Sequence, residues 1–370
     1  MGTRPEAIKM APVAHALAAR GLAPRLVLTG QHPDLDLREH KLASFECLAL
    51  RCPGERDPHR HVGSVTAALL PKLRERPSLI VVQGDTSSAL GAALAANTSE
   101  VPLAHVEAGL RTHDPKRPWP EEEYRTAIDA GAELLFAPTA AAADNLRREG
   151  VPGRIEVTGN TGIDAVLAAA ATLPSPRLHD GAARRILVTT HRRESWGDAL
   201  RSIASAVADL ARSGANLDVV LPPNGFVADS IRRLLGGTPN VSFLPPCTHA
   251  ELLRRMRQSD LLLSDSGGMQ EEAPALGVPL LVLRDETERP EAIATGNSRL
   301  VGTDGKRIVA EALRLLADPA ALAAMSRPSF PFGDGRAGPR IAAIIEEWLE
   351  EQPSDAVTSA RSAPGTPARW

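Results

Sequence analysis

The sequence predicts an α/β protein with two domains, each built around a parallel sheet. Short apolar runs of strand length alternate with amphipathic segments of helix length, which is the pattern of βαβ units. The runs form two series of about five, and each series indicates one sheet. A chain of 370 residues is also long for one domain, because domains commonly have about 150 residues.

Each series can be placed along the chain. The first-series strands are expected at residues 25–28, 79–83, 103–106, 134–137 and 155–158. The second-series strands are expected at residues 185–189, 217–221, 241–244, 261–264 and 280–283. Helices are predicted at residues 61–76, 140–149, 202–213 and 249–258, and a last one at 340–350. Turn residues without periodicity, Leu173-Pro174-Ser175-Pro176, mark the break between the series.

This pattern divides the chain into segments. We expect one Rossmann-like domain at residues 1–165 and a second at 166–335. Residues 336–351 are expected to form a helix that packs back on the first domain, and the Pro/Ser/Ala-rich residues 352–370 are expected to be disordered. The opening segment Gly2-Thr3-Arg4-Pro5 has the character of a turn between a strand and a helix. We therefore expect the first strand of the first domain upstream of Met1.

Composition excludes several classes of function. The net charge of −3 gives no general attraction to nucleic acid or to an anionic membrane. The sequence has no run of 18 apolar residues, which argues against a membrane span. It also does not open with a signal segment, which argues against secretion. The three cysteines, Cys47, Cys52 and Cys247, form no CxxC pair, which indicates reduced thiols in a cytoplasmic protein and argues against a zinc site.

The most informative segment is SDSGGMQEEAPALGVPLLVLRDETERPE, residues 264–291. An apolar strand ends here at small residues and passes into a helix that carries Glu271 and Glu272. Free N–H groups and the helix dipole at such a start favour a phosphate, and glycine lets the backbone approach it. A carboxylate one turn further could accept hydrogen bonds from a ribose. The alternative is an ordinary glycine-containing turn.

Other polar residues follow predicted strands or open helices, at the sheet edge where α/β proteins bind ligands. Arg4 and Lys9 lie in the opening turn and helix, and Asp85, Glu107, Arg111, Glu121 and His191 lie at later turns. Each has a structural alternative. Asp85 could cap a helix, Glu121 could be a first-turn acid, and His191 could be a core histidine. No GxGxxG follows a strand, and no GxxxxGK[ST], HExxH or GxSxG motif occurs.

Eight ordered blocks carry a resemblance to a known family. They are GTRPEAIKMAP at 2–12, QGDTSSAL at 83–90, HVEAGLRT at 105–112, PWPEE at 118–122, TGNTGIDA at 158–165, THRRES at 190–195, SDSGGMQEEAPALG at 264–277 and TERPEA at 287–292. Together they resemble the non-hydrolysing UDP-N-acetylglucosamine 2-epimerases. The resemblance implies two Rossmann-like domains in a GT-B arrangement, with the active site in the interdomain cleft and the second domain binding UDP. It also implies a UDP-sugar substrate, a homodimer, no cofactor and no metal.

The resemblance also implies roles for individual residues. Asp85, Glu107, Glu121 and His191 match catalytic residues of the family. The matching substrate-binding residues are Arg4, Lys9, Arg111, Ser266, Gly267, Gly268, Glu272 and Arg289. The implied reaction eliminates UDP to give a 2-acetamidoglucal and adds it back with inversion at carbon 2, in a cytoplasmic enzyme that supplies cell-envelope polysaccharide synthesis.

The chain departs from the family at three places. Tyr124 stands where the family usually has Asn, and LPPNGFV at 221–227 replaces a His-containing segment. A segment that binds an activating second UDP-sugar in many members is here Gln31-His32-Pro33-Asp34. Gln31 and His32 match it, whereas Asp34 replaces an amide with a charge, which puts activation by substrate in question.

Four alternatives stay open at this point. The same machinery could act on a related UDP-sugar, such as a diacetamido-uronic acid, or could release UDP and free N-acetylmannosamine. A GT-B glycosyltransferase would need an acceptor site, and the three carboxylates would then be surplus. A nucleotide-sugar binder without activity is the last alternative.

Overall fold

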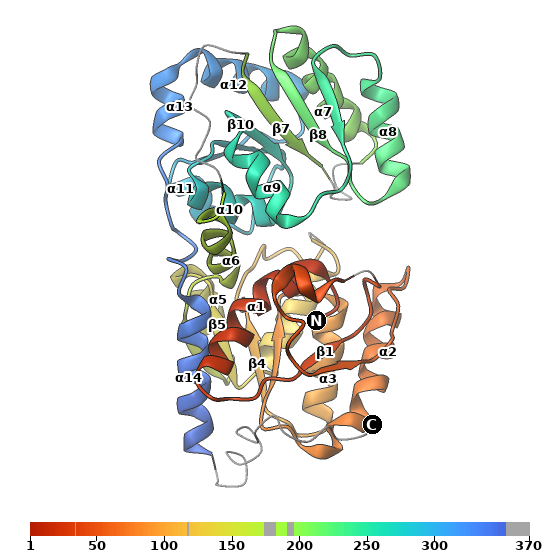
Figure 1. The fold of residues 1–370 in the computed structure, drawn as a ribbon, viewed down its shortest axis with the longest axis vertical. Helices are drawn as coiled ribbons and strands as arrows, with labels where there is room; N and C mark the ends of the chain where they lie inside the picture. Colours follow the sequence, from red (N-terminus) through yellow and green to blue (C-terminus); the bar gives the residue numbers. More distant parts are fainter. Residues whose placement is uncertain (34, 117, 174–182, 191–195, 353–370) are drawn as a thin grey trace. The chain divides into compact units, whose positions relative to one another are not determined.

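The structure is a computed structural model that describes residues 1–33, 35–116, 118–173, 183–190 and 196–352. The chain forms two compact units (Figure 1). Unit 1 contains residues 1–165 and the C-terminal residues from Phe332 onward, and unit 2 contains Val166–Pro331. Both are α/β with parallel strands, so the predicted fold class is confirmed. The predicted tail at 353–370 and most of the predicted break at 173–176 lie outside the described residues.

Unit 1 holds two parallel sheets in its described part. Four strands pair in chain order, β3 (Ile80–Gln83), β4 (Leu103–Val106), β5 (Leu134–Ala137) and β6 (Arg154–Val157). β1 (Leu26–Leu28) pairs with β2 (Cys47–Ala49) in a separate ladder. β4 and β5 are buried at every position, as expected for strands covered by helices on both faces.

The helices of unit 1 cover these sheets. They are α1 (Arg4–Ala19), α2 (Pro58–Leu69), α3 (Ser87–Thr98), α4 (Glu121–Ala130), α5 (Ala140–Glu149) and α14 (Ala337–Glu351), with short 3-10 helices η1 (Leu37–His40) and η2 (Leu70–Glu75). The predicted helix at 61–76 is therefore wrong in extent, since α2 ends at Leu69. Pro71 explains this, because proline lacks an N–H and clashes with the carbonyl four residues earlier.

Helix α14 belongs to unit 1 although it closes the described chain. Ile341, Ile345 and Trp348 pack with Val13 and Leu17 of α1 in one apolar cluster, and the two helices run side by side (Figure 1). The Asp164 carboxylate accepts hydrogen bonds from the N–H groups of the first two residues of α14, at 3.0 and 2.8 Å. Asp164 lies in α6 (Thr161–Ala170), whose second half passes into unit 2.

Unit 2 is built on one sheet with six strands among its described residues, in the order β12-β11-β10-β7-β8-β9. The strands are β7 (Arg185–Thr189), β8 (Asn216–Val220), β9 (Val241–Leu244), β10 (Leu261–Ser264), β11 (Leu280–Val282) and β12 (Ser298–Leu300). The chain builds outward first from β7 and then from β10 in the opposite direction. The carboxyl ends of β7 and β10 thus form the switch point at which open α/β sheets bind ligands.

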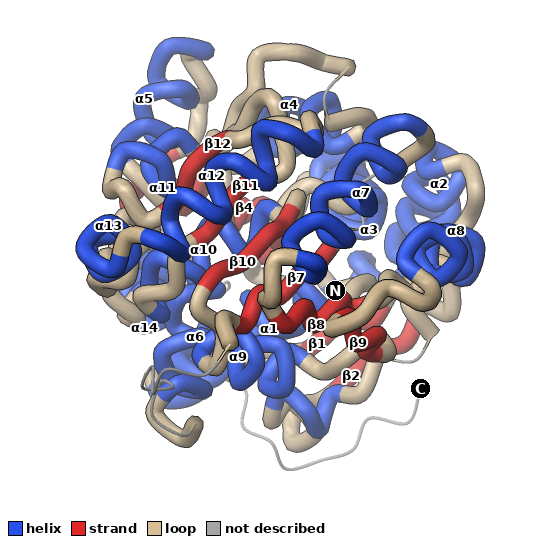
Figure 2. The backbone as a smooth tube through the Cα atoms, turned by 90° about the horizontal axis from the view of Figure 1, so that it is seen from above, coloured by secondary structure: helices blue, strands red, loops and turns tan. Residues whose placement is uncertain are grey.

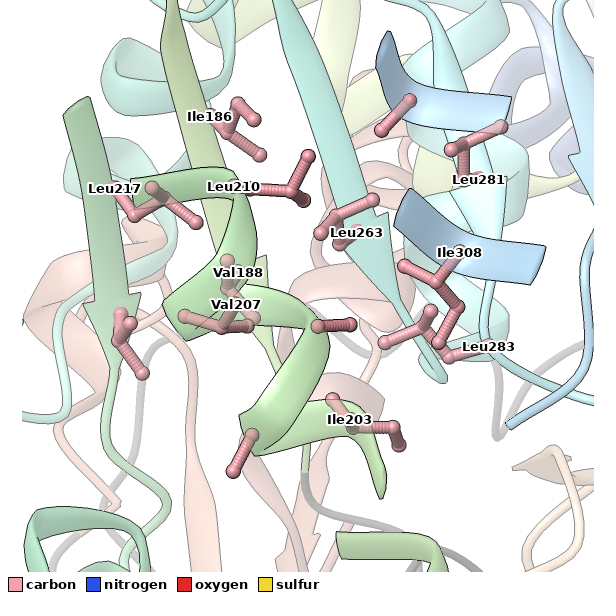
Figure 3. Packing of buried hydrophobic residues seen from close by; sticks show 14 of the residues in the cluster. Ile186, Val188, Ile203, Val207, Leu210, Leu217, Leu263, Leu281, Leu283 and Ile308 are labelled. Atoms are coloured by element: carbon pink, nitrogen blue, oxygen red, sulfur yellow. The ribbon is translucent and has the colours of Figure 1, made fainter. Parts of the chain in front are cut away.

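Helices cover both faces of this sheet, seen from above in Figure 2. They are α7 (Asp198–Arg212), α8 (Gly225–Leu235), α9 (His249–Arg257), α10 (Gly267–Leu276), α11 (Pro290–Ala294), α12 (Gly305–Ala317) and α13 (Pro319–Met325). Figure 3 shows Ile203 and Leu210 of α7 and Ile308 of α12 packed on Val188 and Leu263 of the sheet. No helix among the described residues is long and apolar enough to cross a membrane.

Candidate active site

The turn between β10 and α10 lies at the switch point of unit 2. Ser266 occupies the N-cap position of α10, but its side chain makes no capping hydrogen bond. Ser264 instead holds the turn, because its Oγ accepts from the Ser266 N–H at 3.0 Å and lies 2.6 Å from Thr189 Oγ1 of β7. Gly267 and Gly268 then open the helix. The start of α10 therefore presents backbone N–H groups that the Ser266 side chain does not cap, which is a suitable place for a phosphate.

Glu272 follows one turn further along α10 and has a partner that sequence reasoning missed. His249, the first residue of α9, places Nε2 2.9 Å from Glu272 Oε1. Both side chains are about 15% exposed. Burial lowers the pKa of His249, but the charge and hydrogen bond of Glu272 outweigh this effect and raise the pKa above its ordinary value. No motif spacing signals the pair, because its members lie 23 residues apart.

The predicted substrate residue Arg289 lies in a buried ion-pair network of unit 2. Its Nε contacts Glu271 Oε1 at 2.6 Å, and its Nη1 contacts Glu288, which also accepts from Arg284 at 2.7 Å. All four side chains are less than a tenth exposed. The network ties the segment after β11 to α10. A contact between Arg289 and substrate stays a prediction.

In unit 1, Asp85 lies in the turn between β3 and α3. The alternative role of Asp85 as helix cap is filled by its neighbour, since Thr86 is the N-cap of α3 and its Oγ1 accepts from the Ala89 N–H at 3.0 Å. The Asp85 carboxylate instead pairs with Arg125 of α4, and its side chain is 29% exposed. Asp85 is thus held by a cation while remaining reachable, as an acid/base group requires.

Glu107 follows β4 with a φ of +70°, a left-handed conformation that is uncommon for a residue with a side chain. Lys9 Nζ lies 2.7 Å from both of its carboxylate oxygens. Gln83 Nε2 also donates to this carboxylate, and Asn160 Nδ2 donates at 3.4 Å. The structure therefore places Lys9 on the candidate catalytic carboxylate and identifies Gln83 and Asn160 as further partners.

Glu121 and Glu122 open α4, and the structure separates their roles. Glu122 Oε1 accepts from the N–H groups of Thr112 and His113, both at 2.9 Å, so this residue holds the preceding loop. Glu121 lies four residues before Arg125, the residue of α4 that reaches Asp85, and Arg125 Nη1 also lies 3.3 Å from Glu122 Oε2. A catalytic role for Glu121 stays a prediction.

Arg4 opens α1, whose N-terminus is closed by a residue that sequence reasoning missed. Glu6 Oε2 accepts from the N–H groups of Gly2 and Thr3, at 2.9 and 2.8 Å, and forms a capping box with Thr3. Glu6 Oε1 accepts from Thr86 Oγ1 at 3.1 Å. Glu6 therefore links the Arg4 turn to the Asp85 turn, and the T-x-x-E spacing is a signal that could have revealed it.

Arg111, a predicted substrate residue, has each of its three guanidinium nitrogens engaged. Nε and Nη2 contact Glu149 at 2.8 and 2.6 Å, Nη2 also contacts Asp129 at 2.7 Å, and Nη1 donates to the Leu110 carbonyl at 2.8 Å. Its side chain is 2% exposed. The structure thus places Arg111 in the frame of the site, which does not favour direct contact with a substrate.

The predicted effector residues Gln31 and His32 differ in their contacts and exposure. Gln31 Oε1 accepts from Ser88 Oγ at 2.7 Å, so its amide turns toward α3. His32 is exposed at the surface, and the partial loss of water around its ring lowers its pKa. Asp34 lies outside the described residues, as does the candidate catalytic residue His191.

Unit 2 is doubly wound and has a helix start that its N-cap side chain does not cap. Unit 1 holds carboxylates that are paired with cations. Together these features define a class of proteins that act on nucleotide-linked substrates. The family follows from comparison. A model of the UDP-N-acetylglucosamine 2-epimerase family matches residues 15–346. The chain belongs to this family, and the predicted assignment as an epimerase is confirmed.

Individual relatives are similar to this sequence over almost its whole length. The UDP-N-acetylglucosamine 2-epimerase of Salmonella typhimurium is 40% identical over 367 residues, covering 94% of this chain and 97% of that protein. The Escherichia coli (strain K12) enzyme is 41% identical and covers 93% and 96%. The crystal structure of the Neisseria meningitidis enzyme bound to UDP-GlcNAc matches with a TM-score of 0.87 and 33% identity, over 94% and 98%. This likeness confirms the GT-B fold class.

Proposed function

We propose that this chain interconverts UDP-N-acetylglucosamine and UDP-N-acetylmannosamine by inverting carbon 2 of the sugar. The carbon 2 proton is not next to a carbonyl, so its direct removal would be very slow. Departure of UDP from carbon 1 develops positive charge there and makes the neighbouring proton acidic. Elimination then gives a 2-acetamidoglucal and UDP, and addition of UDP with protonation of the opposite face completes the inversion.

The observation that supports the proposal is the set of contacts and positions of three carboxylates in unit 1. Asp85 is paired with Arg125, and Glu107 is clamped by Lys9 and Gln83. Glu121 lies four residues before Arg125 in α4. Inversion needs acid/base groups on both faces of carbon 2, and this set supplies them. A glycosyltransferase has no use for such a set.

Unit 2 supplies the groups for UDP in this proposal. The N–H groups of Gly267 and Gly268, with the Ser266 hydroxyl, bind the diphosphate, and Glu272 accepts hydrogen bonds from the ribose. Arg4 and His191 add positive charge or hydrogen bonds to the leaving phosphate. Arg4→Ala and Glu272→Ala should weaken UDP binding in calorimetry, whereas unchanged affinity in both variants would refute these placements.

One experiment tests the reaction directly. Incubation with UDP-N-acetylglucosamine in heavy water, followed by proton NMR, reports the epimer formed, deuterium at carbon 2 and released UDP together. We expect both epimers with deuterium at carbon 2 and little net release of UDP. Stoichiometric UDP with free N-acetylmannosamine would indicate the hydrolysing reaction, and absence of deuterium would refute elimination.

Variants then test the three carboxylates. Asp85→Asn, Glu107→Gln and Glu121→Gln should each lose about 100- to 10,000-fold in turnover while still binding UDP, which is the usual contribution of a positioned acid/base group. Glu123→Gln is the matched control, because Glu123 is an exposed acid in the same first turn of α4. Near-normal turnover in the three variants would overturn the proposal.

We also propose a cytoplasmic homodimer. The free thiols of Cys47, Cys52 and Cys247 support a reducing compartment. Light scattering on the purified chain tests the dimer, and a monomeric mass with full activity would exclude it as a requirement.

A further inference from the structure

A chain of buried charged groups runs behind the Asp85 turn. His105 of β4 and Asp129 of α4 are both fully buried, and His105 Nδ1 lies 2.6 Å from Asp129 Oδ1. Asp129 Oδ2 contacts Arg111 at 2.7 Å, and Arg111 continues to the partly exposed Glu149. At the other end, His105 Nε2 lies 2.8 Å from the Gly84 carbonyl oxygen. This series of linked side chains thus begins near the surface at Glu149 and ends on Gly84, the residue before Asp85.

The hydrogen-bond partners determine where the protons of the imidazole lie. The Gly84 carbonyl can only accept, so His105 Nε2 carries a hydrogen. Asp129 Oδ2 accepts from the Gly109 N–H as well as from Arg111, as an ionised carboxylate does. His105 Nδ1 therefore also donates.

The charges of the groups linked to His105 are compatible with this arrangement. The linked groups include two carboxylates, Asp129 and Glu149, and one guanidinium, Arg111. The buried Asp129 and Arg111 balance each other, whereas Glu149 is partly exposed to water. A positive imidazole on His105 neutralises the set.

The contact with Gly84 acts on the candidate catalytic residue. The Gly84 carbonyl and the Asp85 N–H belong to one planar peptide group, so fixing the carbonyl fixes the rotation of the backbone into Asp85. Gly84 has a φ of +69°, which glycine adopts freely, so the glycine itself does little to restrict this turn. We propose that His105 is a positioning residue of the epimerase, donating from Nδ1 to Asp129 and from Nε2 to the Gly84 carbonyl so that it fixes the Gly84–Asp85 peptide. This inference rests on the proposed acid/base role of Asp85.

Two substitutions separate positioning from general stability. In His105→Asn the amide nitrogen replaces Nδ1, which keeps a donor to Asp129 and loses the donor to Gly84. In His105→Gln the amide nitrogen replaces Nε2, which keeps the donor to Gly84. Both variants remove the positive charge. His15→Gln is the control, because His15 is exposed on α1 of the same unit.

We expect His105→Asn to lower kcat about 10- to 100-fold with an unchanged Kd for UDP, since small displacements of catalytic groups have effects of this size. His105→Gln should retain kcat within about fivefold, and His15→Gln should match the native enzyme. Equal kcat losses in the Asn and Gln variants, or native kcat in the Asn variant, would overturn positioning through Gly84.

Nitrogen-15 NMR of histidine-labelled native protein tests the protonation without any variant. One ring should show both nitrogens protonated at neutral pH, and this signal should be absent from His105→Gln. A neutral ring at His105 would overturn the proposed charge state even if the variants failed to fold. If Asp85→Asn proved fully active, the role of Asp85 would fail by itself, whereas an inactive Asp85→Asn with a native His105→Asn would reject only the inference.

Discussion

The His249–Glu272 pair makes unit 2 sensitive to pH in a direction that the structure predicts. The pKa of His249 is raised in the folded chain, because the charge and hydrogen bond of Glu272 outweigh the lowering by burial. A group with a raised pKa stabilises the folded state fully below its unfolded pKa, ordinarily about 6.5. That stabilisation is lost as the pH rises through the folded pKa of His249. Stability from this pair should therefore be larger at about pH 5.5 than at pH 9.

The size of the effect follows from geometry. The two atoms lie 2.9 Å apart, and the side chains are about 15% exposed. Exposed ion pairs contribute about 0.2–1 kcal/mol, and hydrogen bonds to charged groups about 1.5–3 kcal/mol. A pair between these limits should show a coupling of about 1–2 kcal/mol when His249 is charged, and a smaller coupling when it is neutral, because the charge attraction is then lost.

A double-mutant cycle with His249→Ala and Glu272→Ala measures this coupling. Unfolding in urea is best followed by hydrogen exchange of unit 2 peptides, because two units need not unfold together. The Glu251–Arg254 pair on α9 is the control, since arginine stays charged and its coupling should not change between the two pH values. A His249–Glu272 coupling that is equal at both pH values would refute the reasoning.

Three further predictions concern other parts of the molecule. Trp348→Ala should destabilise unit 1 by about 3–5 kcal/mol, because this largely buried ring joins α14 to α1, and hydrogen exchange should show unit 2 unchanged. Gly109→Ala should lower the melting temperature more than Gly150→Ala. Both glycines have positive φ, but only at Gly109 would a Cβ lie 2.3 Å from a carbonyl oxygen, that of Ala142. Initial rates against UDP-N-acetylglucosamine should be hyperbolic, and sigmoidal curves that Gln31→Ala abolishes would show that the effector site works.

The clearest of the correctly predicted strands share one physical property, whereas others such as β6 and β9 are only partly buried. In a sheet covered on both faces, every side chain of a strand is buried, and the strand reads as a continuous apolar run. Leu134–Ala137 and Leu261–Ser264 are buried throughout and were recognisable for this reason. β2 and β12 were missed, because their three residues each are partly exposed or polar and give no such run.

The candidate site was predictable only in part. Motif residues such as Asp85 and Glu107 stand out because they follow apolar strands. Their partners do not, since Arg125 lies 40 residues from Asp85 and Lys9 lies 98 residues from Glu107. The packing of strands and helices determines which carboxylate pairs with which cation. The spacing of residues within one motif does not predict this pairing. The capping box at Glu6 is the exception, because both of its members belong to one helix turn.

The Asp85 turn shows why these partners matter. Three consecutive residues are held from three directions, Gly84 by His105, Asp85 by Arg125 and Thr86 by Glu6. Buried charges are weak evidence for stability, because an apolar core of the same volume is often as stable or more so. Acid/base chemistry, in contrast, gains from a carboxylate whose backbone and side chain are both fixed before the substrate arrives. The charges around this turn are therefore better explained by the position they impose on Asp85 than by any contribution to folding.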